Sequence, residues 1–337
     1  MKKVLVLLLA ILMLALTLTA CAGGKKEEAP PAATASPVDV RVAALKGPTA
    51  MGMVKFMDDA DSGKLEDNNY KFEITAAIDE VTTKVVQGEI DIAAVPANLS
   101  SVLYNKTEGG VDVLAINVLG VLYIVEKGDS VNSVADLKGK TIYASGKGAT
   151  PEFALNYILK GNGIDPEKDV TIEWKSEHAE CVAALENSAD GVAMLPQPFV
   201  TTAQVQDSTI RTAIDLNEAW NGLQANEKEP SALVVGTLII RKEFLDANPD
   251  AVKAFLDHYK ESVDFVDSNL DEASALVGKY DIVPEAVAKK AIPKCNISFI
   301  EGAELKTKLS GYLAVLYDQN PQSVGGALPG DDFYYSR

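Results

Sequence analysis

The sequence reads DIAAVP at residues 91–96 and DGVAMLP at residues 190–196. Each stretch is a short apolar segment between an aspartate and a proline, a composition typical of a strand that is buried on both faces of a parallel sheet. Loops that follow such strands lie at the carboxyl edge of the sheet, where open α/β sheets bind ligands. Any two buried strands share some similarity, but the repetition predicts a second sheet like the first.

Strands and helices alternate on both sides of the first stretch. We expect helices at 48–60, 81–87 and 97–104 between strands at 38–45, 70–77, 90–95 and 111–117. Strands separated by helices indicate right-handed crossovers and a mostly parallel sheet with helices on both faces.

The alternation restarts near residue 120. Strands are expected at 122–125, 141–145, 170–174 and 192–195, and helices at 150–161 and 177–187. A strand-like segment at 232–241 precedes a mostly helical remainder, with helices expected at 242–248, 249–269, 271–279, 284–290 and 301–317. The chain therefore leaves a first lobe, builds a second and returns.

This order predicts an α/β fold of two lobes, each with a mostly parallel sheet flanked by helices, joined by a two-strand hinge. Lobe 1 is predicted to contain residues 38–118 and 236–337, and lobe 2 residues 119–235. The two crossings are expected near 118–123 and 233–238.

The N-terminal residues have the composition of an export signal. Lys2 and Lys3 precede an apolar segment that ends at Leu18, and Cys21 follows shortly after it. Residues 18–21 resemble the lipobox of bacterial lipoproteins, in which the bond before the cysteine is cleaved and the cysteine is lipidated. We predict a signal peptide at 1–20, a lipid anchor on Cys21 and a flexible tether at 21–37. The alternative is an ordinary leader followed by an incidental cysteine.

Charge and cysteine content argue against two further classes of function, nucleic-acid binding and metal binding. The net charge is −17, and the chain has no basic cluster that could release phosphate counterions, so nucleic acid is not an expected partner. Beyond Cys21 only Cys181 and Cys295 remain, without the close spacing of a zinc site, and we predict no metal and no cofactor. The two cysteines are expected in different lobes, so a disulfide between them is the less favoured alternative.

Candidate ligand contacts are the residues that follow the predicted strands. Free N–H groups at helix N-termini can bind anionic or polar ligands there. The loop SGKGATP at 145–151 is the strongest candidate, because its glycines let the backbone approach a ligand closely. The alternative is a tight turn without a ligand, and the Walker pattern for nucleotide binding is absent. The predicted ligand-binding residues are Lys46, Thr49, Met51, Asn98, Ser145, Gly146, Lys147, Gly148, Ala149, Thr150, Gln197 and Trp220.

Several of these residues have a structural alternative. Thr49 and Met51 could serve only in capping and core packing. Asn98 and Gln197 follow the two proline-ended strands and could contact a ligand or cap the next helix. Trp220, in an expected loop at 217–226, could close over a ligand or pack within its own lobe.

The order of several motifs resembles a known receptor family. Similar segments are SVADLKGK at 133–140, TIYASGKG at 141–148, LNYIL at 155–159, GID at 163–165 and FLDANPDAVKAF at 244–255. They resemble the type II periplasmic binding proteins of ABC importers, in particular the nitrate/sulfonate/taurine branch, which includes receptors for thiamine-precursor pyrimidines. The likeness covers residues 40–270, and Gln197 stands where the branch commonly has an acidic residue before proline.

The resemblance implies an extracytoplasmic solute-binding receptor anchored to the membrane. It would capture one small organic or oxyanionic ligand between two closing lobes and deliver it to ABC permease and ATPase subunits, as a monomer. A lipid-anchored receptor that serves a sensor is one alternative. The other is an enzyme on the same fold, of the thiamine-pyrimidine or chorismate dehydratase type, which acts inside cells.

We predict that the protein is not an enzyme. His178 and His258 occur in helical patterns without a Ser or Cys motif that would mark a triad, and both are expected on the surface. Cys181 follows His178 by three residues and is expected to be buried in its helix.

Overall fold

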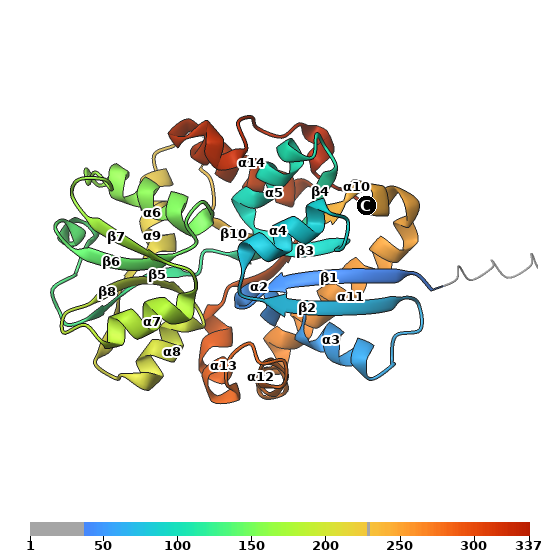
Figure 1. Cartoon of the computed structure of the whole chain (residues 1–337), viewed down its shortest axis with the longest axis horizontal. Helices are drawn as coiled ribbons and strands as arrows, with labels where there is room; N and C mark the ends of the chain where they lie inside the picture. Colours follow the sequence, from blue (N-terminus) through green and yellow to red (C-terminus); the bar gives the residue numbers. More distant parts are fainter. Residues whose placement is uncertain (1–36, 228–229) are drawn as a thin grey trace, which may run out of the picture. The chain divides into compact units, whose positions relative to one another are not determined.

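The computed structural model describes residues 37–227 and 230–337 (Figure 1). The predicted signal peptide, the lipid anchor on Cys21 and all but the last residue of the predicted tether lie outside this range. None of the helices in the described range combines the length and the apolar composition needed to cross a bilayer.

The first sheet contains six strands in the order β11-β4-β10-β3-β1-β2. Their bounds are β1 Asp39–Leu45, β2 Asn69–Thr75, β3 Ile92–Pro96, β4 Val111–Leu119, β10 Val234–Arg241 and β11 Ile297–Ile300. Strands β1 to β4 share one direction, while β10 runs antiparallel between β3 and β4, and β11 runs antiparallel at the edge.

The second sheet contains five strands in the order β7-β6-β8-β5-β9. Their bounds are β5 Leu122–Lys127, β6 Thr141–Ser145, β7 Thr171–Lys175, β8 Val192–Pro196 and β9 Ile210–Asp215. Only β5 opposes the common direction. The two proline-ended stretches are β3 and β8, both fully buried, and each lies between a parallel and an antiparallel neighbour. The predicted two-lobe α/β fold is thus confirmed.

Helices cover both faces of each sheet. Their bounds are α2 Pro48–Met51, α3 Val54–Asp61, α4 Ile78–Val86, α5 Ala97–Lys106, α6 Thr150–Gly161, α7 His178–Glu186, α8 Phe199–Gln206, α9 Leu216–Gln224, α10 Lys242–Ala247, α11 Pro249–Ser268, α12 Leu270–Lys279, α13 Glu285–Ala291 and α14 Gly302–Gln319. Successive residues of β1 show the two-sided burial, because Val42 and Ala44 pack toward α3 and α11 while Ala43 packs toward α4. In the second sheet α6 and α9 cover one face, and α7 and α8 cover the other.

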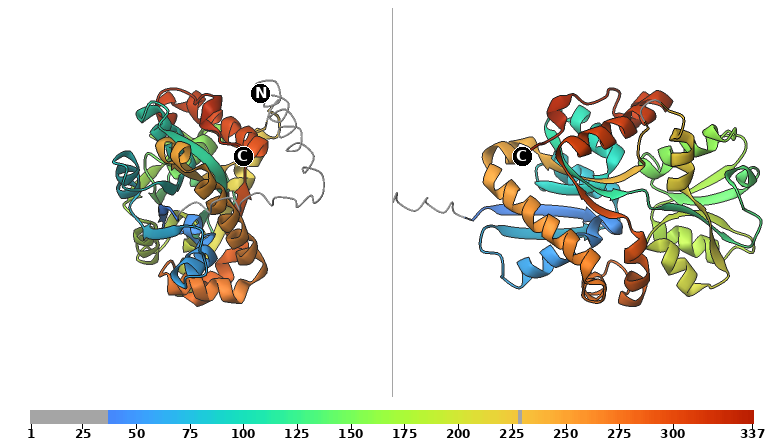
Figure 2. Two further views of the ribbon diagram at one scale, coloured as in Figure 1. Left: turned by 90° about the vertical axis from the view of Figure 1, so that its right-hand side faces the viewer. Right: turned by 180° about the vertical axis from the view of Figure 1, so that it is seen from behind.

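Helix α14 connects the apolar cores of the two lobes. Its buried residues Leu305, Leu309 and Leu313 belong to one core cluster that contains α6 and β6 of lobe 2 and also β4 of lobe 1 (Figure 2, red helix). This shared core joins the lobes on the α14 side. On the side of the junction opposite α14 lie α7 and α8 of lobe 2, with α8 beside α13 of lobe 1 (Figure 1).

Some local predictions were wrong. The helix expected at 48–60 is divided into α2 and α3, and the strands β9 and β11 were not anticipated. The loop expected at 217–226 is largely helix α9, whose N-terminus is capped by the Asp215 carboxylate. Trp220 is therefore fully buried, and its Nε1 donates a hydrogen bond to the Ser231 carbonyl at 3.2 Å. It packs in the core shared by lobe 2 and α14, where its ring centroid lies 5.5 Å from that of Tyr312, so the packing alternative describes its position better than a ligand lid.

The two remaining cysteines are free. Cys181 is buried in the core between α7 and the second sheet, and Cys295 is buried in the large core of the first lobe. The two cysteines lie in different cores, and the expected burial of Cys181 within its helix is confirmed.

Candidate functional site

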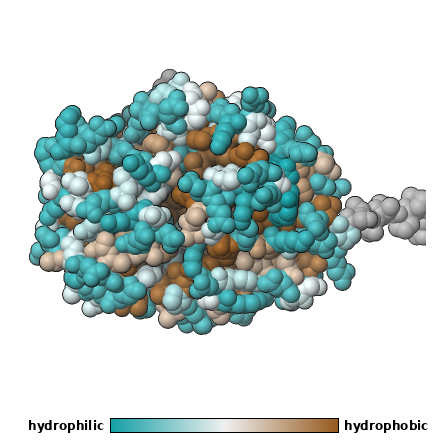
Figure 3. All heavy atoms as spheres, in the orientation of Figure 1, coloured by the Kyte–Doolittle hydropathy of each residue, from teal (hydrophilic) through white to brown (hydrophobic). Residues whose placement is uncertain are grey.

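A cavity of about 400 Å³ lies between the two sheets, on a face where apolar side chains gather (Figure 3). Parallel strands of both sheets end at it, through Leu45 of β1, Pro96 of β3, Ser145 of β6 and Pro196 of β8. The antiparallel strands β5 and β10 begin there. Both sheets therefore present to this cavity the edge at which open α/β sheets bind ligands.

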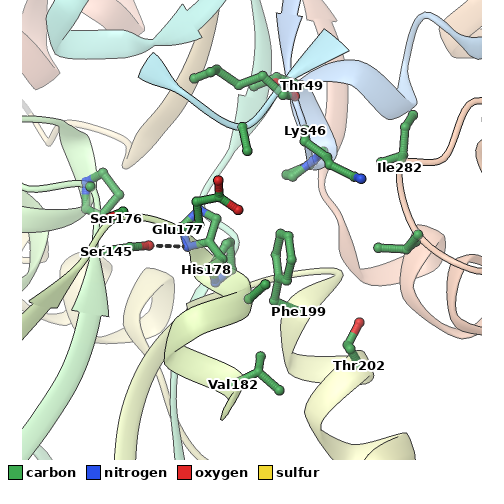
Figure 4. Close-up of a pocket in the computed structure, with 18 of the residues that line it drawn as sticks. Lys46, Thr49, Ser145, Ser176, Glu177, His178, Val182, Phe199, Thr202 and Ile282 are labelled. Carbon is green, nitrogen blue, oxygen red and sulfur yellow. Dashed lines mark hydrogen bonds between the residues drawn. The ribbon is translucent and has the colours of Figure 1, made fainter. Parts of the chain in front are cut away.

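Most of the cavity wall is apolar. Its apolar side chains come from both lobes and include Leu45, Pro48, Ile78, Leu122, Val182, Phe199, Val235, Ile282 and Val283. In Figure 4, Lys46 approaches from one side, Phe199 from a second and Ile282 from a third. A mostly apolar concave space with a few polar groups is the usual form of a small-molecule site.

A serine and a histidine form the central polar pair of the wall. Ser145 Oγ, at the end of β6, lies 2.5 Å from His178 Nδ1, at the start of α7 (Figure 4, dashed line). Burial lowers the pKa of His178 to about 4, so the ring is neutral at pH 7. When Ser145 donates this hydrogen bond, the neutral ring carries its proton on Nε2, which is then a donor. The ring centroids of His178 and Phe199 are 5.0 Å apart.

The charged residues of the wall are mostly acidic. Glu177, Glu186 and Asp281 line the cavity together with Lys46, and no arginine is among the described residues that do so. Lys46 Nζ lies 3.2 Å from Asp281 Oδ2, so its charge is already paired across the cavity mouth. Within residues 37–227 and 230–337, no group of three or more His, Cys, Asp or Glu side chains is arranged to hold a metal ion.

Solved structures with the same architecture span nearly the whole chain. An ABC transporter protein from Parabacteroides distasonis is 20% identical and superposes with a TM-score of 0.72, covering 90% of this chain and 99% of that one. The aliphatic sulphonate binding protein SsuA from Escherichia coli is 16% identical with a TM-score of 0.70, covering 89% and 93%. The chain has the fold of the periplasmic substrate-binding proteins.

Sequence comparisons agree with this binding-protein fold. A family model described as "ABC transporter, phosphonate, periplasmic substrate-binding protein" matches residues 64–224. A Bacillus subtilis (strain 168) protein that carries the name of a binding protein, YtlA, is 24% identical over 216 residues, covering 54% of this chain and 64% of that protein. The match thus covers less than two thirds of that relative's length.

Four of the residues predicted from the sequence meet at the cavity of the binding-protein fold: Lys46, Thr49, Ser145 and Gly146. Thr49 Oγ1 donates to the Leu45 carbonyl at 2.7 Å, so it also holds the turn after β1. Gly146 has a φ of +83°, and an added Cβ would lie 2.8 Å from Pro151 Cγ. Glycine is therefore required where the wall turns from β6 into α6.

The other predicted residues do not line the cavity. Asn98 is buried, and its Nδ2 donates to the carbonyls of Gly148 at 3.2 Å and Ser323 at 3.0 Å. Gln197 Oε1 accepts hydrogen bonds from the Thr201 backbone N–H at 3.3 Å, as in the helix-capping alternative, and from Thr201 Oγ1 at 2.8 Å. Lys147 lines a separate hollow beside α6 and β7. Residues that pack or turn outside the lining are Met51, Gly148, Ala149, Thr150 and Trp220.

Sequence reasoning missed the start of α7 and the loop between α12 and α13. The prediction that His178 is a surface residue was wrong, because it is half-buried in the cavity wall, whereas His258 lies partly exposed near Asp67. A signal for Glu177 and His178 existed, since they lie two and three residues after the end of β7 at Lys175, while Ser145 and Gly146 lie at and just after the end of β6. No local signal marks the loop at 281–284.

Proposed function

We propose that this protein is an extracytoplasmic receptor that captures one small molecule between its two lobes and delivers it to an ABC importer. The observation that carries the proposal is the cavity at which the carboxyl ends of both sheets converge. A ligand that contacts both lobes from opposite sides lowers the free energy of the closed state relative to the open state. Binding therefore favours closure of the two lobes.

The tether, the partners and the lobe limits belong to the same proposal. Export with a lipid on Cys21 would hold the receptor at the membrane, where a permease and an ATPase subunit could receive its ligand. The names of the similar proteins support an importer. We propose lobe limits of 38–118 with 236–337 and 119–235, and a monomer as the working form.

The Ser145–His178 pair favours binding over hydrolysis. In a Ser-His-Asp triad the serine bonds to Nε2 of the histidine, while the aspartate orients the ring through Nδ1. Here the serine occupies Nδ1 at 2.5 Å, the position that an orienting carboxylate would need. We infer that the pair orients the imidazole as a hydrogen-bond donor toward a bound molecule.

The test is to identify what the protein holds. The full-length chain is purified from membranes in mild detergent, denatured, and the released small molecules are measured by mass spectrometry against a mock purification. We expect one enriched compound at near-equimolar amount, which binds again to the emptied protein with a 1:1 stoichiometry by calorimetry. An emptied protein that binds neither this compound nor any fraction of the growth medium would contradict the proposal.

A further inference from the structure

We propose that the cavity selects a small organic cation, such as an amine or amidine on an apolar or aromatic body, and rejects oxyanions. This inference rests on the proposed receptor function and specifies its ligand class. It departs from the phosphonate and sulphonate in the names of the similar proteins. It follows from the charges of the wall, the helix ends beside it, the absence of an available arginine and one carboxylate oxygen that is unpaired among the described residues.

The first argument is the balance of charge. Three carboxylates line the cavity, those of Glu177, Glu186 and Asp281, against the single ammonium group of Lys46. Lys46 is paired with Asp281 at 3.2 Å, which leaves Glu177 and Glu186 uncompensated by lining residues of the described chain. An entering anion would meet a wall of its own sign, whereas a cation would be attracted.

The second argument is that the arginines are engaged elsewhere. Planar oxyanions are commonly held by the two-pronged guanidinium group. All four arginines of the chain are bonded to carboxylates away from the cavity: Arg41 and Arg241 to Asp91, Arg211 to Glu126, and Arg337 to Asp257 and Glu301. No guanidinium group is therefore available to a ligand.

The third argument concerns two of the helix N-termini near the cavity in lobe 2, those of α6 and α7; α8, which also begins at the cavity wall, has no acidic residue in its first turn. The Ser176 N–H, before α7, donates to Glu180 Oε2 at 2.8 Å, and the Gly148 N–H, before α6, donates to Glu152 Oε2 at 2.5 Å. Each helix thus places one of its own carboxylates at the end that would otherwise attract an anion. His178 is neutral and adds no positive charge.

The fourth argument is an oxygen atom without a partner. Glu186 lines the cavity, and its Oε1 is buried with no donor in hydrogen-bond range among the described residues. A buried carboxylate oxygen is costly unless it accepts a hydrogen bond. Because Oε1 has almost no accessible surface, Glu186 would act on a cationic ligand through the negative charge of its carboxylate, and the nearby face of Phe199 would suit the apolar body or the charge.

The experiment uses isosteric probes that differ in charge: benzamidine, benzamide and benzoate, with phenylphosphonate as a larger anion. Their affinities for the emptied full-length protein are measured by calorimetry at pH 7 and low salt. We expect benzamidine to bind about tenfold or more tightly than benzamide, which corresponds to about 1.4 kcal/mol, and both anions to bind more weakly than benzamide.

Matched variants test whether a carboxylate of the cavity wall causes the preference for a cationic ligand. Glu186→Gln is expected to weaken benzamidine binding about tenfold and to change benzamide binding less than about twofold. Asp318→Asn, the same loss of charge on an exposed residue of α14 outside the cavity, should leave both affinities unchanged. Circular dichroism confirms that each variant is folded.

Either of two results would overturn the inference. The first is tighter binding of benzoate or phenylphosphonate than of benzamidine, and the second is a lack of saturable binding by all four probes. The receptor function is judged separately by the copurified compound. An anionic compound there would refute the ligand class and support the receptor, whereas the lack of any bound compound would refute the receptor itself.

Discussion

The two ends of each sheet use charge in opposite ways. At the end far from the cavity, a buried carboxylate is fully paired with arginine: Asp91 with Arg41 and Arg241 in lobe 1, and Glu126 with Arg211 in lobe 2. At the cavity end, carboxylates face an apolar space and meet one lysine. Carboxylates are therefore neutralised by arginine at the end far from the cavity, whereas at the cavity end two of them, Glu177 and Glu186, have no basic partner among the described lining residues.

The distal ends owe their strength to hydrogen-bonded burial. Asp91 accepts bonds from the Arg41 backbone N–H and Nε, at 3.0 and 2.8 Å, and from Arg241 Nη2 at 2.8 Å. Burial acts to raise the pKa of Asp91, but these hydrogen bonds outweigh it and hold the pKa below its ordinary value. The cluster ties β1, β3 and β10 together.

The largest expected effect is therefore on stability at a distal end. Asp91→Ala should lower the free energy of unfolding by about 3 kcal/mol, because it leaves Arg41 and Arg241 without their shared buried partner. Urea unfolding measures the change, and the copurified compound should still bind to the folded fraction. A loss below about 1 kcal/mol would show that the cluster is not a structural anchor.

The second effect is on binding at the cavity end. Phe199→Ala removes a wall side chain that is only partly buried, so ligand affinity should fall about tenfold while the unfolding free energy changes by less than about 1.5 kcal/mol. Calorimetry with the copurified compound measures the first quantity and urea unfolding the second. Equal affinity in wild type and variant would remove α8 from the site.

The two ends should also respond to acid in different pH ranges. The pKa of His178 is about 4 in the folded protein and about 6.5 in the unfolded chain, so the unfolded chain binds a proton at this residue more readily. The free energy of unfolding therefore decreases as the pH falls from about 6.5 to about 4. Asp91 has a lowered pKa, so the stability that it adds above its unfolded pKa of 3.8 is lost only as the pH falls below that value.

His178→Gln separates these ranges. Between pH 6.5 and 4, the free energy of unfolding should fall less steeply with decreasing pH in the variant than in wild type, and the two slopes should differ by at most one proton. Below pH 4 the slopes of the two proteins should be equal. Urea unfolding at several pH values measures the slopes. Parallel curves for the two proteins would show that His178 titrates normally in the folded state.

The smallest effect is expected at the cavity mouth. Lys46 and Asp281 form a solvent-exposed pair, and Asp281 is completely exposed, so Asp281→Asn should change the unfolding free energy by less than about 1 kcal/mol. Thermal unfolding measures this change. The same variant should weaken cation binding less than Glu186→Gln does, because solvent screens its charge.

Much of the fold was predictable because the signals are local. The burial periods of β6, α6 and α11 are visible in the sequence, and their predicted ranges agree with the structure to within a residue. Helix α9 was missed because its polar residues, Asn217 and Asn221, suggested a loop. In the folded protein the burial of Trp220 and the Asp215 cap outweigh that weak preference.

The site was predictable only where a residue lies at the carboxyl end of a strand or within a few residues after it. Ser145, Gly146 and Lys46 were found by that rule, and His178 could have been. Asn98 and Gln197 satisfy the same rule, yet their amides bond to nearby protein groups. Whether a polar side chain faces a cavity or a neighbouring carbonyl depends on the packing of other elements.

By itself the sequence determined the alternation of strands and helices and the repetition of one sheet design, because burial periodicity acts over a few neighbouring residues. Only the tertiary structure decided that Glu186 and the loop at 281–284 share a wall with Ser145. Those groups lie far apart along the chain, and their meeting depends on how two lobes pack around the core shared through α14.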